Sequence, residues 1–232
     1  MSLEKRKRAL IELLKRINLL KDPEVEKAML TVPRELFVPE QFRELAYEDR
    51  PLPIGFNQTI SAPGVVARMT ELLRPRRGHK VLEVGTGSGY QAAILAEIVK
   101  PEGRVWSIER ISALAEKAKE NLARAGYLEY VTVIVGDGSK GYPEAAPYDR
   151  IIVTVACPEV PKPLLEQLKP EGRLVAPVGG SDLQVLMVVD KLSDGTVSSF
   201  YDIEVVFVPL IGEYGWKSEN DFYKTERNTQ FW

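Results

Sequence analysis

The segment from Val81 to Tyr90 constrains the fold of this chain more than any other. It reads Val-Leu-Glu-Val-Gly-Thr-Gly-Ser-Gly-Tyr, a short apolar run followed by glycines at three alternate positions. Glycines let a backbone turn sharply and approach a ligand where a Cβ atom would collide. An apolar strand that runs through such a loop into a helix is typical of open α/β sheets, which bind ligands beyond the carboxyl ends of their strands. The segment therefore predicts a cofactor-binding loop rather than a turn that serves packing alone.

Short β-branched runs and helical patterns alternate after Lys80. Strands are predicted over 81–84, 104–108, 131–135, 150–155 and 173–177, and helices over 90–99, 112–125 and 163–168. This alternation implies right-handed crossovers and a parallel sheet covered by helices on both faces. Two further strands, 183–190 and 198–208, flank a Ser-Asp-Gly turn and predict an antiparallel hairpin. We therefore expect an α/β fold with a doubly wound, mostly parallel seven-stranded sheet of Rossmann-like form that ends in this hairpin.

The residues before this alternation predict helices and then a loop. Leucine and isoleucine recur at helical spacing between Leu10 and Leu20, and Asp22-Pro23 is a start signal for a second helix that Pro33 ends. Residues 51–63 are rich in Pro, Gly and small polar residues, which favours an irregular loop before a helix over 65–73. We expect an N-terminal helical leader (residues 1–50) packed on a main domain (residues 51–216). No element is predicted for the tail (residues 217–232).

Composition and charge exclude several classes of protein. Of the 232 residues, 44% are hydrophobic and 28% are charged, which is enough apolar material for one sizeable core. The net charge of −2 gives no basic field to hold a nucleic acid. No apolar stretch approaches the ~20 residues of a membrane-spanning helix, and no signal-peptide core is present. One cysteine and one histidine cannot form a disulfide or a Cys/His metal cage, so we expect a cytoplasmic protein without a metal site.

The spacing of the glycines indicates the class of cofactor. A dinucleotide fingerprint counted from Gly85 needs Gly or Ala where Tyr90 stands, and counted from Gly87 it begins too late after the strand. An acid inside the strand, Glu83, followed by Gly85, Gly87 and Gly89 instead resembles the first motif of class I S-adenosylmethionine-dependent methyltransferases. That resemblance implies S-adenosylmethionine as cofactor and S-adenosylhomocysteine as product. A nicotinamide-dependent dehydrogenase is the weaker alternative.

Two acids at the ends of later strands agree with this interpretation. Glu109 lies 20 residues after Gly89, where a carboxylate accepts hydrogen bonds from ribose hydroxyls in nucleotide sites. Asp137, in Gly136-Asp137-Gly138, stands where methyltransferases of this class hold the adenine amino group. Acids at strand ends also cap helices, so neither residue is diagnostic without the glycine loop.

The loop before the first strand of the alternation points to one family. Pro-Leu-Pro-Ile-Gly-Phe-Asn-Gln-Thr-Ile-Ser-Ala-Pro, residues 51–63, closely resembles the signature loop of the protein-L-isoaspartate O-methyltransferases, enzymes that repair damaged aspartyl and asparaginyl residues. Further similarity lies in Val-Pro-Arg-Glu-Leu-Phe-Val-Pro (32–39), Gly-Asp-Gly-Ser-Lys-Gly (136–141), Ala-Pro-Tyr-Asp (146–149) and Phe-Val-Pro-Leu (207–210). The resemblance covers roughly residues 25–216 and implies methyl esterification of the α-carboxylate of L-isoaspartyl residues, after which the ester cyclises without an enzyme.

The same resemblance assigns the site. It makes Ser61 the catalytic residue, and the cofactor-binding residues are expected to be Gln58, Thr59, Ile60, Glu83, Gly85, Thr86, Gly87, Ser88, Gly89, Glu109, Arg110, Asp137 and Gly138. Ser61 could also cap the helix that follows it. Two residues depart from the family pattern: Gly64 replaces a usual His or Tyr, and Phe56 stands where some members have His. Both changes would remove contacts near the cofactor.

The chemistry needs few residues, and it leaves alternatives open. An ionised carboxylate is already a nucleophile at neutral pH, so methyl transfer to it requires no general base and no metal. Two other functions remain, a class I methyltransferase for another carboxylate or small-molecule acceptor and a protein that only senses the cofactor. The expected partners are damaged protein segments that contain L-isoaspartyl residues. We expect the chain itself to be a monomer that binds neither nucleic acid nor membrane.

Overall fold

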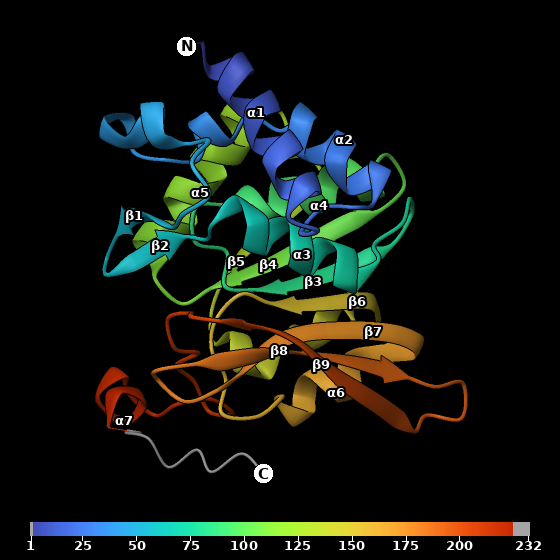
Figure 1. Cartoon of the computed structure of the whole chain (residues 1–232). Helices are drawn as coiled ribbons and strands as arrows, with labels where there is room; N and C mark the ends of the chain where they lie inside the picture. The colour runs from blue at the N-terminus through green and yellow to red at the C-terminus, as the bar shows by residue number, and fades with distance from the viewer. Residues whose placement is uncertain (1, 225–232) are drawn as a thin grey trace.

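The computed structural model describes residues 2–224 and is built around one seven-stranded sheet (Figure 1). The strands are β3 (Lys80–Val84), β4 (Arg104–Glu109), β5 (Val131–Val135), β6 (Tyr148–Val153), β7 (Leu168–Gly179), β8 (Gln184–Lys191) and β9 (Val197–Val205). They lie in the order β5-β4-β3-β6-β7-β8-β9. The pairs from β5 to β7 are parallel, whereas β8 is antiparallel to both of its neighbours. The predicted doubly wound α/β fold with a terminal hairpin is confirmed.

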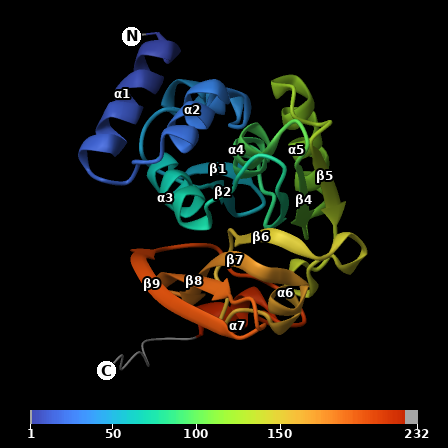
Figure 2. The same ribbon diagram turned by 90° about the vertical axis from the view of Figure 1, so that its right-hand side faces the viewer.

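Helices cover both faces of the sheet (Figure 2). The helices α3 (Pro63–Leu73), α4 (Tyr90–Val99) and α5 (Ser112–Ala125) lie on one face, and α6 (Lys162–Gln167) lies on the other. Successive side chains of a strand point to opposite faces, so each strand supplies both layers. Val81 belongs to the core that contains Leu95 of α4, whereas its neighbour Leu82 belongs to the core that contains Leu164 of α6.

The leader forms helices that pack on the α4 side of the sheet. Helix α1 (Leu3–Arg16) is followed by α2 (Pro23–Thr31), and the 3₁₀ helices η1 (Arg34–Leu36) and η2 (Glu40–Leu45) complete it. As predicted, Asp22 caps α2, and its carboxylate accepts the backbone N–H groups of Glu24 (2.8 Å) and Val25 (3.4 Å). Leu14 of α1 is fully buried in the same core as α4. The division of the chain into domains stays a prediction.

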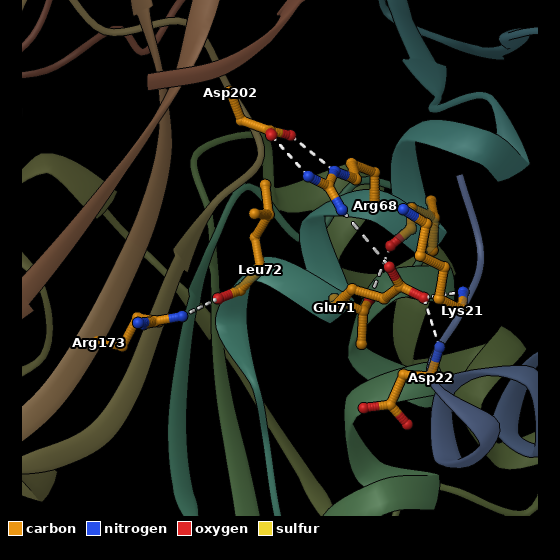
Figure 3. Close-up of polar contacts among 9 residues, drawn as sticks. Lys21, Asp22, Arg68, Glu71, Leu72, Arg173 and Asp202 are labelled. Carbon is orange, nitrogen blue, oxygen red and sulfur yellow. Dashed lines mark hydrogen bonds and ion pairs between the residues drawn. The ribbon is translucent and has the colours of Figure 1, made fainter. Parts of the chain in front are cut away.

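Helix α3 connects the leader to the far edge of the sheet (Figure 3). On one side, the guanidinium of Arg68 forms two hydrogen bonds of 2.6 Å with the carboxylate of Asp202 in β9. On the other side, the carboxylate of Glu71 accepts the backbone N–H groups of Lys21 and Asp22. Arg68 also lies 3.6 Å from Glu71, so the three side chains form one network across the molecule.

The predicted irregular loop over 51–63 is wrong in part, because its first half is a β-hairpin. Strands β1 (Leu52–Gly55) and β2 (Gln58–Ile60) pair antiparallel, with Leu52 opposite Ile60. The two turn residues, Phe56 and Asn57, both have positive φ angles, 54° and 57°. A two-residue turn of this hand normally contains Asn-Gly, so Phe56 hides the hairpin signal, and the prolines at 51 and 53 argue against a strand.

Among the other boundaries, the largest differences from the prediction are at the start of β7 and the end of β9. Strand β7 begins at Leu168, where an irregular stretch separates the pair Tyr148–Leu168 from the regular register at Arg173. Strand β9 ends at Val205 rather than at 208, because the backbone N–H of Phe207 donates to the side chain of Gln184 (2.7 Å) instead of to a strand partner.

The beginning of the tail contains a short helix that the sequence pattern did not predict. Helix α7 (Glu219–Tyr223) starts at Ser218, and its Phe222 packs edge-on against Trp216 with ring centroids 5.4 Å apart. Residues 225–232 of the predicted tail lie outside the described residues. Within residues 2–224, no helix combines the length and the apolar character needed to cross a bilayer.

Candidate active site

A cleft opens where β3, β4 and β6 end, next to the point at which the strand order reverses. It encloses about 880 Å³, counting the part open to solvent. Its lining comes mainly from the residues before α3, the glycine loop (residues 85–89), the ends of β4 and β6, and residues 208–211. The predicted site residues found in its wall are Gln58, Thr59, Ile60, Ser61, Gly85, Thr86, Gly87, Ser88, Glu109, Arg110 and Gly138. Glu83, Gly89 and Asp137 are not among the residues that line the cleft.

Neighbouring protein atoms restrict the residues that the glycine loop can contain. All three glycines have positive φ angles, 101° at Gly85, 54° at Gly87 and 88° at Gly89. A Cβ on Gly85 would lie 2.6 Å from the hydroxyl oxygen of Thr154, and a Cβ on Gly89 would lie 3.2 Å from Leu122. Close packing and positive φ angles therefore both favour glycine at 85 and 89, whereas a Cβ on Gly87 would make only an ordinary contact, 3.5 Å from Ile54.

Glu109 is placed to hold a ribose. Its Oε2 accepts the backbone N–H of Gly87 (2.9 Å), and its Oε1 accepts the N–H of Ile111 (2.9 Å). A carboxylate oxygen has two lone pairs, so each oxygen keeps one for a ligand hydroxyl. The side chain is 7% exposed and lines the cleft. The two backbone N–H groups thus orient the carboxylate, and its two oxygens can each accept one hydroxyl of the ribose of S-adenosylmethionine.

Glu83 lies behind the loop rather than in the cleft. Its side chain is fully buried, its Oε2 accepts a hydrogen bond from the hydroxyl of Ser107, and its Oε1 has no partner among the described residues. Burial in this apolar surrounding raises the pKa of Glu83 to about 8. The Ser107 hydroxyl also lies 2.6 Å from the hydroxyl of Thr86, which lines the cleft. The chain Glu83–Ser107–Thr86 thus supports the loop from beneath.

Asp137 uses its carboxylate to fasten one wall of the cleft. Its Oδ1 accepts the backbone N–H (2.9 Å) and the hydroxyl (2.6 Å) of Ser139, and its Oδ2 accepts the backbone N–H of Glu213 (2.8 Å). The hydroxyl of Ser139 accepts the next N–H, that of Tyr214 (3.0 Å). These bonds hold residues 209–216, which we call the strap, against η3 (Gly138–Lys140). The adenine contact expected of Asp137 stays a prediction.

Ser61 faces the cleft just before α3. The helix begins at Pro63 with Ala62 as its N-cap, and no side chain caps it. The alternative that Ser61 caps this helix is therefore wrong. Within residues 2–224 the Ser61 hydroxyl forms no hydrogen bond, while its backbone carbonyl accepts one from the guanidinium of Arg34 (2.8 Å). A free hydroxyl in a cleft beside the glycine loop is available to a ligand.

Gly64 and Phe56, the two residues that depart from the family pattern, lie outside the cleft. Gly64 lies in the first turn of α3, where its N–H donates to Asp49 (2.7 Å) and a Cβ would come within 2.8 Å of Asp49 and of Leu19. The leader therefore occupies the space of the missing side chain. Phe56 is 57% exposed at the hairpin turn. Neither residue lines the cleft, so the expected loss of cofactor contacts does not match their positions.

Two other chemically reactive side chains, those of Cys157 and His79, have no place in the cleft. Cys157 is fully buried, donates to the carbonyl of Pro177 (3.2 Å), and has a pKa raised to about 12 by burial, which excludes a reactive thiolate. His79 accepts the backbone N–H of Arg76 (3.1 Å) at the opposite end of β3. Tyr90, in contrast, lines the cleft.

Sequence reasoning missed several residues of the cleft. Thr154 and Val155 line it after β6, Val208 lines it just before the strap, and Pro209, Leu210 and Ile211 line it from the strap. The family-like Phe-Val-Pro-Leu stretch was the available signal, yet it lies far beyond β6 in the sequence, and nothing in the pattern indicated that it returns to the cleft. The strap reaches the cleft by pairing with Ala156, whose backbone bonds to Val208 and Leu210 (2.7 Å each).

Comparisons with known proteins agree with this geometry. The sequence profile of the family described as protein-L-isoaspartate(D-aspartate) O-methyltransferase matches residues 5–215. A protein-L-isoaspartate O-methyltransferase of Staphylothermus marinus is 59% identical over 219 residues, which are 92% of this chain and 97% of the relative. Another, of Aeropyrum pernix, is 56% identical over 223 residues, or 96% of this chain and 83% of the relative.

Solved structures show the same similarity. A protein-L-isoaspartate O-methyltransferase with 33% sequence identity superposes with a TM-score of 0.79 and covers 90% of this chain and 67% of its own. A protein of Plasmodium falciparum described as a protein-L-isoaspartate O-methyltransferase, solved with S-adenosyl-L-homocysteine, is 27% identical with a TM-score of 0.77 and covers 88% and 97%. With its cleft, its glycine loop and these relatives taken together, the chain belongs to the protein-L-isoaspartate(D-aspartate) O-methyltransferase family.

Proposed function

We propose that this chain methylates the α-carboxylate of L-isoaspartyl residues in damaged proteins and peptides, with Ser61 as the residue that orients the acceptor. One observation carries the proposal: the unbonded hydroxyl of Ser61 lines the same cleft as Glu109 and the glycine loop. The family profile and the names of the relatives support the reaction, and the position of Ser61 supports its assignment to this part of the cleft.

Each wall of the cleft has one task. Glu109, which is oriented by the N–H of Gly87, would hold the ribose of S-adenosylmethionine, and Gly138 with the strap would border its adenine. When bound, the cofactor supplies an electrophilic methyl group on a sulfonium ion. The hydroxyl of Ser61 donates a hydrogen bond to one oxygen of the acceptor carboxylate and leaves the other free to attack. Rate acceleration then comes from holding the reacting atoms in line, because no proton has to move.

Replacement of Ser61 tests this role. A hydrogen bond to a charged group contributes about 1.5–3 kcal/mol, so Ser61→Ala should lower kcat/KM for an isoaspartyl peptide roughly 10- to 100-fold. The affinity for S-adenosylhomocysteine, measured by calorimetry, should stay within about twofold. Ser199→Ala, on the exposed outer strand β9, is the matched control and should turn over like the unsubstituted chain.

The acceptor is tested with matched peptides. The unsubstituted chain should form a methyl ester on a peptide with one isoaspartyl residue and none on the same peptide with ordinary aspartate. Equal turnover of both peptides would point to a general carboxylate methyltransferase. Binding of S-adenosylhomocysteine without any ester formation would point to a cofactor sensor. Sedimentation of the same preparation measures whether the chain is the monomer that we expect.

A further inference from the structure

The buried guanidinium of Arg34 has no role in the reaction described so far. Arg34, at the start of η1, is 0% exposed. Its Nε donates to the carbonyl of Ala46 (2.8 Å) and its Nη2 to the carbonyl of Ser61 (2.8 Å), while its Nη1 has no hydrogen-bond partner in the described part of the chain. The centre of the guanidinium lies 4.8 Å from the ring centroid of Tyr90.

Among residues 2–224, no carboxylate forms an ion pair with this guanidinium. The two acids nearby in the sequence bond to other groups: Glu35 accepts from the hydroxyl of Tyr47, and Asp49 accepts the N–H of Gly64 (2.7 Å). The charge of Asp49 still acts on Arg34, but without a direct contact. Burial lowers the pKa of Arg34 to about 10, so the guanidinium still carries its charge at neutral pH. Buried charges in proteins are normally paired, since desolvation without a counter-ion is costly.

The position of this charge relates it to the acceptor. Arg34 contacts Ser61 and Tyr90, and both of these residues line the cleft from the side on which Arg34 lies. A charge in a surrounding of low dielectric constant acts over a longer distance than one in water. Two anions enter a cleft of this kind, the acceptor carboxylate and the carboxylate of the cofactor. Arg34 is bonded to the Ser61 segment and not to the glycine loop, which favours the acceptor.

We propose that Arg34 is a positioning residue that selects an anionic acceptor: its Nη2 fixes the peptide of Ser61, and its unpaired buried charge attracts the substrate carboxylate to that segment. The inference rests on the proposed function and names the group that makes the cleft prefer a carboxylate over a neutral side chain. A brace between two carbonyl oxygens would require hydrogen-bond donors but no positive charge.

Two substitutions separate charge from bracing. Arg34→Gln keeps hydrogen-bond donors and removes the charge, and Arg34→Lys keeps the charge with fewer donors. Arg34→Gln should raise KM for an isoaspartyl peptide about tenfold or more while Kd for S-adenosylhomocysteine stays within about twofold, and Arg34→Lys should recover KM to within about threefold of the unsubstituted chain. An unchanged KM in Arg34→Gln, or a loss of S-adenosylhomocysteine affinity as large as the rise in KM, would overturn the proposal.

Arg173 of β7 provides the matched control (Figure 3). Its side chain is 11% exposed and is bonded to Asp190 (2.6 and 2.7 Å) and to the carbonyl of Leu72 (3.1 Å), away from the cleft lining. Arg173→Gln should lower the unfolding midpoint in urea and leave KM unchanged. A comparable rise of KM in this variant would show that loss of stability alone explains the Arg34 result.

A second measurement uses the unsubstituted chain, so it does not depend on whether a variant folds. Two isoaspartyl peptides, one with the free α-carboxylate and one with an α-carboxamide, are titrated into the complex with S-adenosylhomocysteine. The carboxylate peptide should bind about tenfold or more tightly, and equal binding would overturn the role of Arg34. Turnover of the isoaspartyl peptide by the unsubstituted chain tests the proposed function separately: its absence rejects both inferences, whereas its presence with equal binding rejects only this one.

Discussion

At the scale of single residues, Glu83 couples the glycine loop to pH. Its pKa is near 4.5 in an unfolded chain and about 8 in the fold, so between these values the folded state holds a proton that the unfolded state has lost. The contribution of Glu83 to stability is therefore largest below pH 4.5 and is lost as the pH rises toward 8, by roughly 1.4 kcal/mol per pH unit. Above pH 8 it changes no further.

Glu83→Gln tests this linkage because glutamine keeps the shape and an acceptor for Ser107 but does not titrate. Urea unfolding of both proteins at pH 5, 7 and 9 should show that the variant gains stability relative to the unsubstituted chain as the pH rises. Parallel curves for the two proteins would show that Glu83 titrates normally in the fold.

At the scale of elements, α3 meets the leader at Gly64, where a side chain would have to displace two side chains of the leader. A side chain at Gly64 would displace the carboxylate of Asp49 and the side chain of Leu19, each 2.8 Å from its Cβ. Overpacking of this kind costs about 1–3 kcal/mol. Gly64→Tyr, which introduces a residue common in the family, should lower the free energy of unfolding by that amount without improving the affinity for S-adenosylhomocysteine.

Gly136→Ala is the control for this substitution, since a Cβ there meets nothing within 4 Å and the φ angle is not positive. It should change the free energy of unfolding by less than about 0.5 kcal/mol. Tighter binding of S-adenosylhomocysteine by Gly64→Tyr would show that the tyrosine reaches the cleft, contrary to the position of Gly64 in the fold.

At the scale of the whole molecule, the network of Arg68, Glu71 and Asp202 joins three regions that are distant in sequence (Figure 3). The side chains of Arg68 and Asp202 are only 22% and 16% exposed, so removing one charge leaves its partner poorly solvated. Asp202→Asn should lower the free energy of unfolding by about 1–3 kcal/mol. Glu102→Gln breaks a similar bidentate pair with Arg77, which is 69% exposed, and should have a far smaller effect in the same urea titration. Equal effects of the two variants would contradict a role for burial.

The elements of the sheet could be predicted because their signals are local. A strand such as Val81–Val84 and a helix such as Ser112–Ala125 each carry their period within about ten residues. The hairpin β1–β2 was missed because Phe56 occupies a turn position that usually carries Asn, Asp or Gly. The strap was missed because its contact with Asp137 joins residues 76 apart in the chain.

The amino-acid sequence by itself determined the fold class, the glycine loop, the acid at the end of β4 and the family-like segment that contains Ser61. Only the tertiary structure decided which of these groups share a cleft: it left Glu83 and Asp137 out of the cleft lining, filled the space beside Gly64 with the leader, and put the charge of Arg34 against Ser61. The physical reason is that periodicity and turn chemistry act between near neighbours, whereas burial, unpaired charge and hydrogen bonding depend on which distant segments pack together.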